Sequence, residues 1–349
     1  MNVSEIVIPS AAKSMEHATI ALGGMDNKRT RPKFVWLWDE AGDLFTISPD
    51  EKAAILIHQQ HRGLTPGSLA DTVFRGSSHN GNVFLLQNLI QDELHIFHST
   101  DGKSAHSFSI FTSGIISADA WCNEECSQMM IVVLTLAGLE WWIKDFEDDI
   151  LELKYRQDFG HEYRINIPQD PSAIVKLNPE GLMNAFILGE NNGDVTLTHY
   201  NGIESNQLLN IKNGRRPKQL RPALTPMVDN TAKQSPIEFA IGHGGFPKSS
   251  WEFFVFDPQN NEFKIQTTYN KPEYDLYSYL FPKEMINHRY IAEDEGEVGV
   301  KTVDQGTWVP VFKDSIEHPF LLDDSLCGIL KKGDDWILLC APLEKEIKV

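Results

Sequence analysis

The chain has 349 residues, which is enough for two average domains or for one large domain built from repeats. Asp and Glu outnumber Lys and Arg by 49 to 31, giving a net charge of −18, which disfavours general binding to nucleic-acid phosphates. Hydrophobic residues make up 41% of the chain and charged residues 23%, a balance typical of folded globular proteins and not of disordered ones.

The N-terminal residues carry no recognisable targeting signal. They lack the basic start and the apolar core of a secretory signal, and no later window has the roughly 18 uninterrupted apolar residues of a membrane span. The four cysteines are too few for a disulfide framework. We therefore expect reduced thiols and a cytoplasmic or otherwise intracellular location, while delivery into another cell without such a signal stays open.

Seven stretches of the chain each place two short apolar runs around a turn, a pattern that predicts antiparallel hairpins. They cover residues 34–48, 83–99, 129–146, 185–200, 251–269, 297–312 and 326–343. The expected turns lie at Ala41-Gly42, Gln91-Asp92, Gly138, Asn192-Gly193, Asn260-Asn261, Gln305-Gly306 and Gly333-Asp334. Glycine and asparagine suit such turns because they tolerate positive φ angles.

The hairpins recur at a nearly regular spacing. Most turns are about 45 to 55 residues apart, but the step from 193 to 260 is longer and the step from 305 to 333 is shorter. Extended segments flank the hairpins at residues 18–24, 52–59, 70–76, 105–111, 114–121, 150–157, 172–179, 205–211, 237–245 and 274–281. Each unit therefore has roughly four strands in about 50 residues.

This repeat architecture resembles a β-propeller, loosely of the WD-repeat kind, and the resemblance covers most of the chain without a diagnostic motif. It implies one all-β domain over residues 1–349. In a propeller the inner strands are covered on both faces, which fits apolar runs such as residues 131–134. We predict seven blades, with six as the alternative because the last step is short. Residues 4–9 would supply the strand that the last unit lacks and would close the ring.

One segment breaks the repeat. Residues 210–236 contain four prolines and little β pattern, and we predict a long irregular inter-blade loop there. Its basic residues Arg215, Arg216, Lys218 and Arg221 stand out against the acidic composition. They predict a docking site for a partner protein with an acidic or phosphorylated surface, and a solvated loop is the alternative interpretation.

No sequence motif indicates a catalytic centre. A nucleophile elbow, a phosphate-binding loop and a dinucleotide fingerprint are all missing. Cys122 and Cys126 lack the second close pair of ligands that a structural zinc site needs, so we predict no metal and no cofactor. His95 and His98 are three apart and should point to opposite faces of a strand, where we expect ordinary histidines, with a pH-sensitive surface as the alternative.

These observations together predict a non-enzymatic propeller scaffold that mediates protein–protein interaction and could serve as a subunit of a larger assembly. The alternative is a propeller enzyme or ligand-binding protein that acts on a glycan or small molecule at the central channel. Residues 302–308 look like the Asp-box hairpin of sialidases, but they are one residue short of it. A single imperfect copy does not identify a glycosidase.

Overall fold

The computed structural model describes residues 3–15, 18–23, 34–59, 83–88, 92–122, 127–158, 173–177, 183–191, 194–201, 204–211, 217–222, 237–243, 250–257, 260, 262–270, 285–286, 289–294, 297–302, 308–312, 316–322 and 325–343. Within these ranges the chain forms 27 β-strands and no helix. The described residues accordingly contain no helix that is long and apolar enough to cross a membrane.

The described strands form seven antiparallel sheets, six of four strands and one of three. The first group along the chain is β2 (Thr19–Gly23), β3 (Phe34–Trp38), β4 (Asp43–Ser48) and β5 (Ala53–Gln59). The three-stranded sheet is β6 (Val83–Asn88), β7 (Glu93–His98) and β8 (His106–Phe111). Next come β9 (Ile115–Cys122), β10 (Gln128–Thr135), β11 (Gly138–Asp145) and β12 (Leu151–Asp158).

The second half of the chain repeats this arrangement. One sheet is β13 (Ala173–Leu177), β14 (Met183–Asn191), β15 (Asp194–Tyr200) and β16 (Ser205–Ile211). Another is β17 (Pro217–Pro222), β18 (Ile237–His243), β19 (Ser250–Asp257) and β20 (Glu262–Asn270). A third is β21 (Met285–Ile286), β22 (Arg289–Asp294), β23 (Glu297–Thr302) and β24 (Trp308–Phe312). The last combines β25 (Glu317–Leu322), β26 (Ser325–Lys332) and β27 (Asp335–Pro342) with β1 (Ser4–Ile8).

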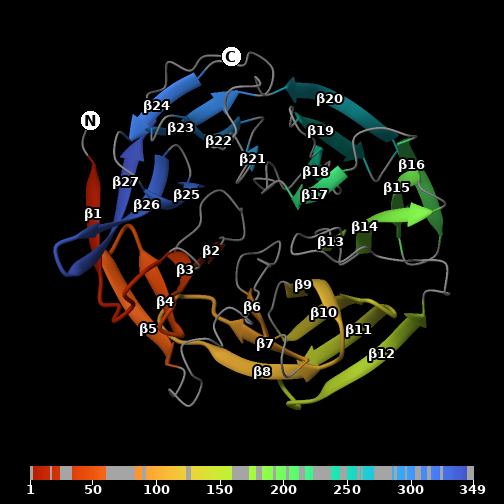
Figure 1. Cartoon of the computed structure of the whole chain (residues 1–349). Coiled ribbons are helices and arrows are strands. Elements are labelled where there is room, and N and C mark those ends of the chain that lie inside the picture. The colour runs from red at the N-terminus through yellow and green to blue at the C-terminus, as the bar shows by residue number, and fades with distance from the viewer. Residues whose placement is uncertain are drawn as a thin grey trace.

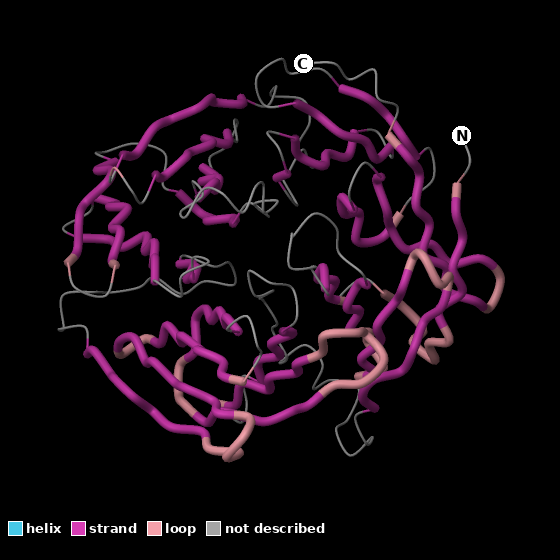
Figure 2. Tube along the Cα trace, turned by 180° about the vertical axis from the view of Figure 1, so that it is seen from behind, coloured by secondary structure: helices cyan, strands magenta, loops and turns pink. Residues whose placement is uncertain are grey.

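The sheets stand around a common centre, as Figure 1 shows, and the view from behind in Figure 2 shows the same ring of strands and loops. The strands nearest the centre are β2, β6, β9, β13, β17, β21 and β25, and those at the rim are β5, β8, β12, β16, β20, β24 and β1 (Figure 1). A sheet in this position has one neighbour on each face, which explains why strands such as β3 are buried along their whole length.

All seven predicted hairpins are present as antiparallel strand pairs. Eight of the ten predicted flanking segments also contain a strand, and residues 70–76 and 274–281 lie outside the described residues. The uneven spacing has a simple cause. In four sheets the predicted hairpin joins the second and third strands, and in the three-stranded sheet it joins the first two described strands, whereas β19–β20 and β23–β24 are third and fourth strands. Their turns therefore come one strand later in the repeat.

Two details of the predicted turns and loops need correction. Gly138 is the first residue of β11 and not part of the turn, and a Cβ added there would clash with the backbone oxygen of Gln157. The segment 210–236 is not one irregular loop, because residues 210 and 211 end β16 and Pro217–Pro222 forms β17. Prolines at both ends of β17 are compatible with a strand because they interrupt its ladder only at the ends.

Hydrophobic side chains from neighbouring sheets form two clusters. One joins β3 and β4 with β6 to β10 and includes Trp36, Phe84 and Ile131, each fully buried. The other joins the same β3 and β4 to the β25–β27 strands and includes Phe45, Phe320 and Leu338. The ring centroids of Trp36 and Phe84 lie 5.7 Å apart. Burial of this apolar surface, at roughly 25 cal/mol per Å², is what holds adjacent sheets together.

The first and last described strands lie side by side. β1 pairs with β27 over five residues, from Ser4 opposite Cys340 to Ile8 opposite Trp336. Two contacts strengthen this pairing, because the indole Nε1 of Trp336 donates to the carbonyl of Ala12 at 2.8 Å and Lys332 pairs with Glu5 at 3.1 Å.

Candidate functional site

Exposed apolar side chains are concentrated in one stretch of the described chain. Eight large hydrophobic residues are exposed among the described residues, and five of them fall between residues 111 and 155. Phe111 at the end of β8 is 68% exposed, and Tyr155 on β12 is 52% exposed. The other three are Leu136, Ile150 and Leu153. Apolar residues grouped at the rim of a folded domain are typical of a surface that another molecule covers.

The rim strand β12 displays its side chains on two faces. Its pairing with β11 shifts register between Trp141 and Trp142, so a bulge separates the two halves of the strand. Leu153 lies opposite Trp142, and Tyr155 lies opposite Trp141 with the two ring centroids 5.0 Å apart. Trp141 thus packs beside Tyr155 on the same face of the sheet, and Tyr155 remains accessible to a partner. An aromatic ring held in place in this way is the commonest type of anchor in protein interfaces.

Charged residues of β12 are arranged in pairs along the strand. Lys154 contacts Glu152, and Arg156 Nε lies 2.9 Å from Asp158 Oδ1. All four side chains are about half exposed or more, so each pair contributes little to stability, on the order of 0–1 kcal/mol. Their effect is to surround the apolar residues with a polar rim that carries no net charge.

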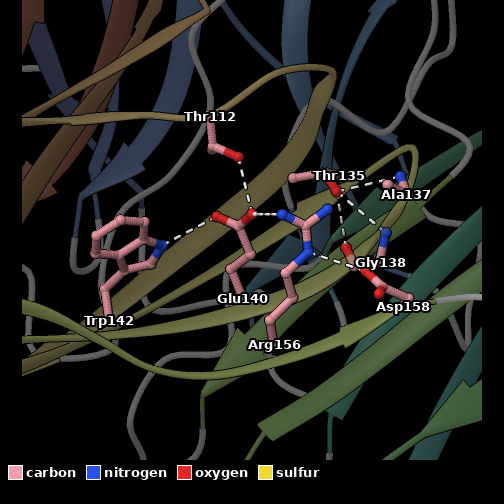
Figure 3. A network of polar contacts seen from close by, with 8 residues as sticks. All are labelled: Thr112, Thr135, Ala137, Gly138, Glu140, Trp142, Arg156 and Asp158. Carbon is pink, nitrogen blue, oxygen red and sulfur yellow. Dashed lines mark hydrogen bonds and ion pairs between the residues drawn. The ribbon is translucent and has the colours of Figure 1, made fainter.

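A buried carboxylate fixes this surface to the next sheet (Figure 3). Glu140 on β11 is 2% exposed and accepts hydrogen bonds from Thr112 Oγ1 at 3.0 Å and from Trp142 Nε1 at 3.1 Å. Arg156 reaches the same carboxylate at 3.5 Å. Because Thr112 directly follows β8, Glu140 connects the β6–β8 sheet with the β9–β12 sheet. Of these contacts the bond from Thr112 crosses between the two sheets, and a hydrogen bond to a carboxylate is worth about 1.5–3 kcal/mol.

The connection from β8 to β9 is held by a second carboxylate. Asp92 adopts a φ of 51° before β7, and its side chain accepts from Ser113 Oγ at 2.8 Å and from the Gly114 amide at 3.2 Å. The Thr112 amide also donates to the Asp92 carbonyl at 2.9 Å, and the Leu136 amide donates to the Gly114 carbonyl at 2.9 Å. Phe111, at the end of β8, therefore leads into a connection whose backbone is hydrogen-bonded, and Leu136, in the turn between β10 and β11, is bonded to that same connection.

Histidine, serine and glutamate form a hydrogen-bonded chain between β7 and β8. Ser109 Oγ lies 3.0 Å from His95 Nδ1, and His95 Nε2 lies 2.9 Å from Glu93 Oε2. The order matches that of a nucleophile, a base and an acid, but Ser109 lies within an unbroken strand ladder and not on the sharp turn that presents a catalytic serine. We interpret the chain as cross-strand bonding. His98 points to the other face, as expected, and stacks on Phe146.

The residues singled out from the sequence are only partly described. Lys218 and Arg221 lie on β17, the strand nearest the centre in its sheet, while Arg215 and Arg216 lie outside the described residues. The expectation of reduced thiols is wrong for one pair, because Cys327 and Cys340 form a disulfide bond between β26 and β27. Cys122 is buried, and Cys126 lies outside the described residues.

Sequence reasoning missed the surface at β8 and β12 because apolar residues in a strand were assigned to packing. The available signal was the charge pattern of residues 152–158, where three charged residues fall within the predicted segment 150–157 and Asp158 follows it. A strand covered on both faces could not accommodate that many charges, so the pattern indicates a rim position.

No protein-family model matches the chain, and no curated protein sequence matches it. Solved structures do match over nearly the whole length. U3-55K covers 97% of this chain and 98% of its own, with 9% identity and a TM-score of 0.54. The Cps50 (Swd1) β-propeller domain of Myceliophteria thermophila covers 97% of this chain and 100% of its own, with 10% identity and a TM-score of 0.53.

An oligogalacturonate lyase in complex with manganese is also similar, with 10% identity over 100% of this chain and 98% of its own, but its TM-score of 0.49 supports no argument about this chain. At such low identities the two stronger matches show the fold alone. Together with the all-β sheets around a common centre, they establish that this chain has the fold of a β-propeller.

Proposed function

We propose that the chain is a non-enzymatic β-propeller scaffold that binds other proteins through its rim. The observation that carries the proposal is the group of exposed apolar residues between Phe111 and Tyr155. A partner that covered them would remove apolar surface from water and would gain the supported Tyr155 ring as an anchor. The rigid connections through Glu140 and Asp92 lower the entropy that such a complex loses on forming.

We further propose that the seven sheets are the blades of a seven-bladed ring and that β1 closes it. The pairing of β1 with β27 and the hydrogen bond from Trp336 to Ala12 support this arrangement. Closure of this kind places the N-terminal strand β1 in one sheet with β25–β27. The scaffold would then present its rim residues in fixed relative positions, which suits a subunit of a larger assembly.

The basic segment with Arg215, Arg216, Lys218 and Arg221 is proposed as a second docking site, for an acidic or phosphorylated partner. Its support is the contrast between this local positive charge and the net charge of −18. Arginine binds carboxylates and phosphates through two parallel hydrogen bonds, so a cluster of three arginines suits such a partner. A cytoplasmic location belongs to the same proposal.

Affinity purification of the full chain from its native host, followed by mass spectrometry, tests the scaffold proposal. The wild type is compared with the Leu153→Glu, Tyr155→Glu double variant and with Leu56→Glu, a matched control at a 45% exposed position on the separate rim strand β5. We expect specific partners with the wild type and the control, and their loss with the double variant. Charge reversal at the four basic positions tests the second site in the same way. Identical protein sets from every variant would contradict the proposal.

A further inference from the structure

The rim strands differ in how they are protected against pairing with another strand. An edge strand offers unpaired N–H and C=O groups, and proteins usually block it with charges, prolines or bulges. Five rim strands show a register shift, typical of a bulge, against the next strand of their sheet. They are β5, β12, β16, β20 and β24. β1 is regular but carries Glu5, which pairs with Lys332.

β8 has none of these protections. It pairs with β7 in unbroken register from His106 opposite His98 to Phe111 opposite Glu93. Its sequence HSFSIF contains no Lys, Arg, Asp, Glu or Pro. Among the strands that the structure describes, β8 pairs with β7 alone and lies at the edge of its sheet. Of the seven described rim strands it is therefore the one best suited to accept a further strand.

The backbone of β8 is held in place from both faces. On one face the Ser109–His95–Glu93 chain ties it to β7. On the other face Phe108 packs edge-on against Phe146, with ring centroids 6.4 Å apart. A strand that is already straight and fixed loses little entropy when a second strand pairs with it, and the 68% exposed Phe111 offers an apolar contact at its end.

The charges around β8 indicate the chemistry of the added strand. Two carboxylates lie near Phe111. Asp92 is exposed, and Glu93, which is buried, lies opposite Phe111 in the β7–β8 pairing. Near the other end of β8, Lys103 is already paired with Glu51 at 3.2 Å. The negative end at Phe111 and the net charge of −18 both favour a segment with a lysine or arginine at that end.

We propose that β8 binds an extended segment of a basic partner protein as an additional strand of the β6–β8 sheet. This inference rests on the scaffold function proposed above, for which it names the site and the partner chemistry. Main-chain hydrogen bonds from alternate residues of β8 would provide affinity. Contacts of the partner with Phe111 and Asp92 would provide direction and selectivity.

Titration calorimetry with two synthetic peptides tests the strand pairing. The first peptide alternates valine and threonine and ends in two lysines, and the second is identical but N-methylated at successive central residues. N-methylation removes the N–H donors from both edges of the peptide and leaves its charge unchanged. We expect the first peptide to bind the full chain at least about tenfold more tightly than the second. Equal affinities, including no binding of either peptide, would overturn the proposal.

A pair of variants locates the binding site. Ser107→Lys places a charge at an exposed position of β8, and Gln207→Lys is the matched control at an exposed position of the bulged strand β16. We expect the first peptide to bind Ser107→Lys at least about tenfold more weakly than it binds the wild type. Its affinity for Gln207→Lys should equal its affinity for the wild type. Phe111→Lys, at the most exposed apolar position described, provides a second variant should Ser107→Lys melt at a lower temperature.

Two results would overturn the inference without touching the scaffold proposal. The first is capture of the native partners by Ser107→Lys as well as by the wild type, while the Leu153→Glu, Tyr155→Glu variant loses them. The second is a wild-type dimer in light scattering that Ser107→Lys converts to a monomer, because a second copy of the chain would then occupy β8. Failure to capture any native partner would instead count against the scaffold function itself.

Discussion

His199 on β15 packs against Phe256 on β19, with the two ring centroids 4.2 Å apart at the junction of two sheets. Both residues are almost fully buried, at 3% and 1% exposure. Removal from water disfavours the charged imidazolium and lowers the pKa of His199 to about 4. The histidine is therefore neutral in the folded protein at neutral pH and acts as a packing group.

This burial predicts a pH-dependent stability. In the unfolded chain a histidine titrates near pH 6.5, so between about pH 6.5 and 4 the unfolded state binds a proton that the folded state does not. Stability should be complete above about pH 6.5 and fall by roughly 2–3 kcal/mol as the pH drops through 4. Urea unfolding across this range, compared with His199→Gln, measures the effect. A variant with the same acid sensitivity as the wild type would contradict this assignment.

Asp39 predicts a pH dependence of the opposite sign. Its carboxylate accepts from the amides of Ala41 and Asp43, both at 2.9 Å, and from Ser10 Oγ. Burial outweighs these bonds and raises the pKa of Asp39. Because the pKa of Asp39 is higher in the folded than in the unfolded state, its contribution to stability is fully present below the unfolded pKa near 3.8. That contribution is lost as the pH rises through the folded-state pKa.

Substitutions at Asp39 separate hydrogen bonding from charge. Asparagine keeps an oxygen for the two amides and removes the buried charge, so Asp39→Asn should be neutral or stabilising at pH 7. Asp39→Ala leaves the amides without an acceptor and should cost about 1–3 kcal/mol. Thermal melting of both variants gives the comparison. If Asp39→Asn were as destabilised as Asp39→Ala, the negative charge of Asp39 would itself be needed for stability, and this prediction would be wrong.

Glu140 is expected to matter more than its exposed neighbours. Glu140→Gln keeps the shape of the side chain but offers one acceptor oxygen where Thr112 and Trp142 now donate to two. We expect the free energy of unfolding to fall by about 1–3 kcal/mol. The matched control is Glu152→Gln, at an exposed ion pair on the neighbouring strand β12, which should change the free energy of unfolding by under about 0.5 kcal/mol. Equal effects in urea denaturation would refute a structural role for Glu140.

The hairpins could be predicted because each combines apolar alternation with a turn residue, and both signals are local. The position of each hairpin within its sheet could not be predicted, because it depends on which strands, distant in sequence, become neighbours in space. Strong apolar runs at residues 251–269 favoured the β19–β20 pair over β18–β19, and this produced the uneven spacing. The exposure of Phe111 was hidden for the same reason, since only the order of strands makes β8 a rim strand.

Gly138 shows that a glycine can be required without a turn. The backbone of β12 passes so close to β11 here that a side chain at Gly138 would displace the carbonyl of Gln157. Gly138→Ala should lower the free energy of unfolding by about 2 kcal/mol or more. The control is Gly333→Asn, because Gly333 has a φ of +67° with open space around it and asparagine tolerates that conformation. The opposite ranking of the two variants in thermal melts would disprove the close-approach argument.

The disulfide bond follows from a register that the sequence already implied. A two-residue turn at Gly333-Asp334 places Cys327 directly opposite Cys340, and the structure pairs these two residues. The bond closes a short loop with a sequence separation of 13, so reduction should lower the free energy of unfolding by roughly 3 kcal/mol. Differential alkylation of the denatured protein, before and after reduction, should locate the bonded pair at these two positions.

The matched variants are Cys327→Ala, Cys340→Ala and the double variant, and reductant should leave the stability of each unchanged. Disulfide bonds persist in oxidising compartments, so the fraction of protein with this bond in cells also reports where the chain resides. Full alkylation of both cysteines in protein taken directly from the native host would show that they stay reduced there, and a bond that forms only after lysis would then have no role in the cell.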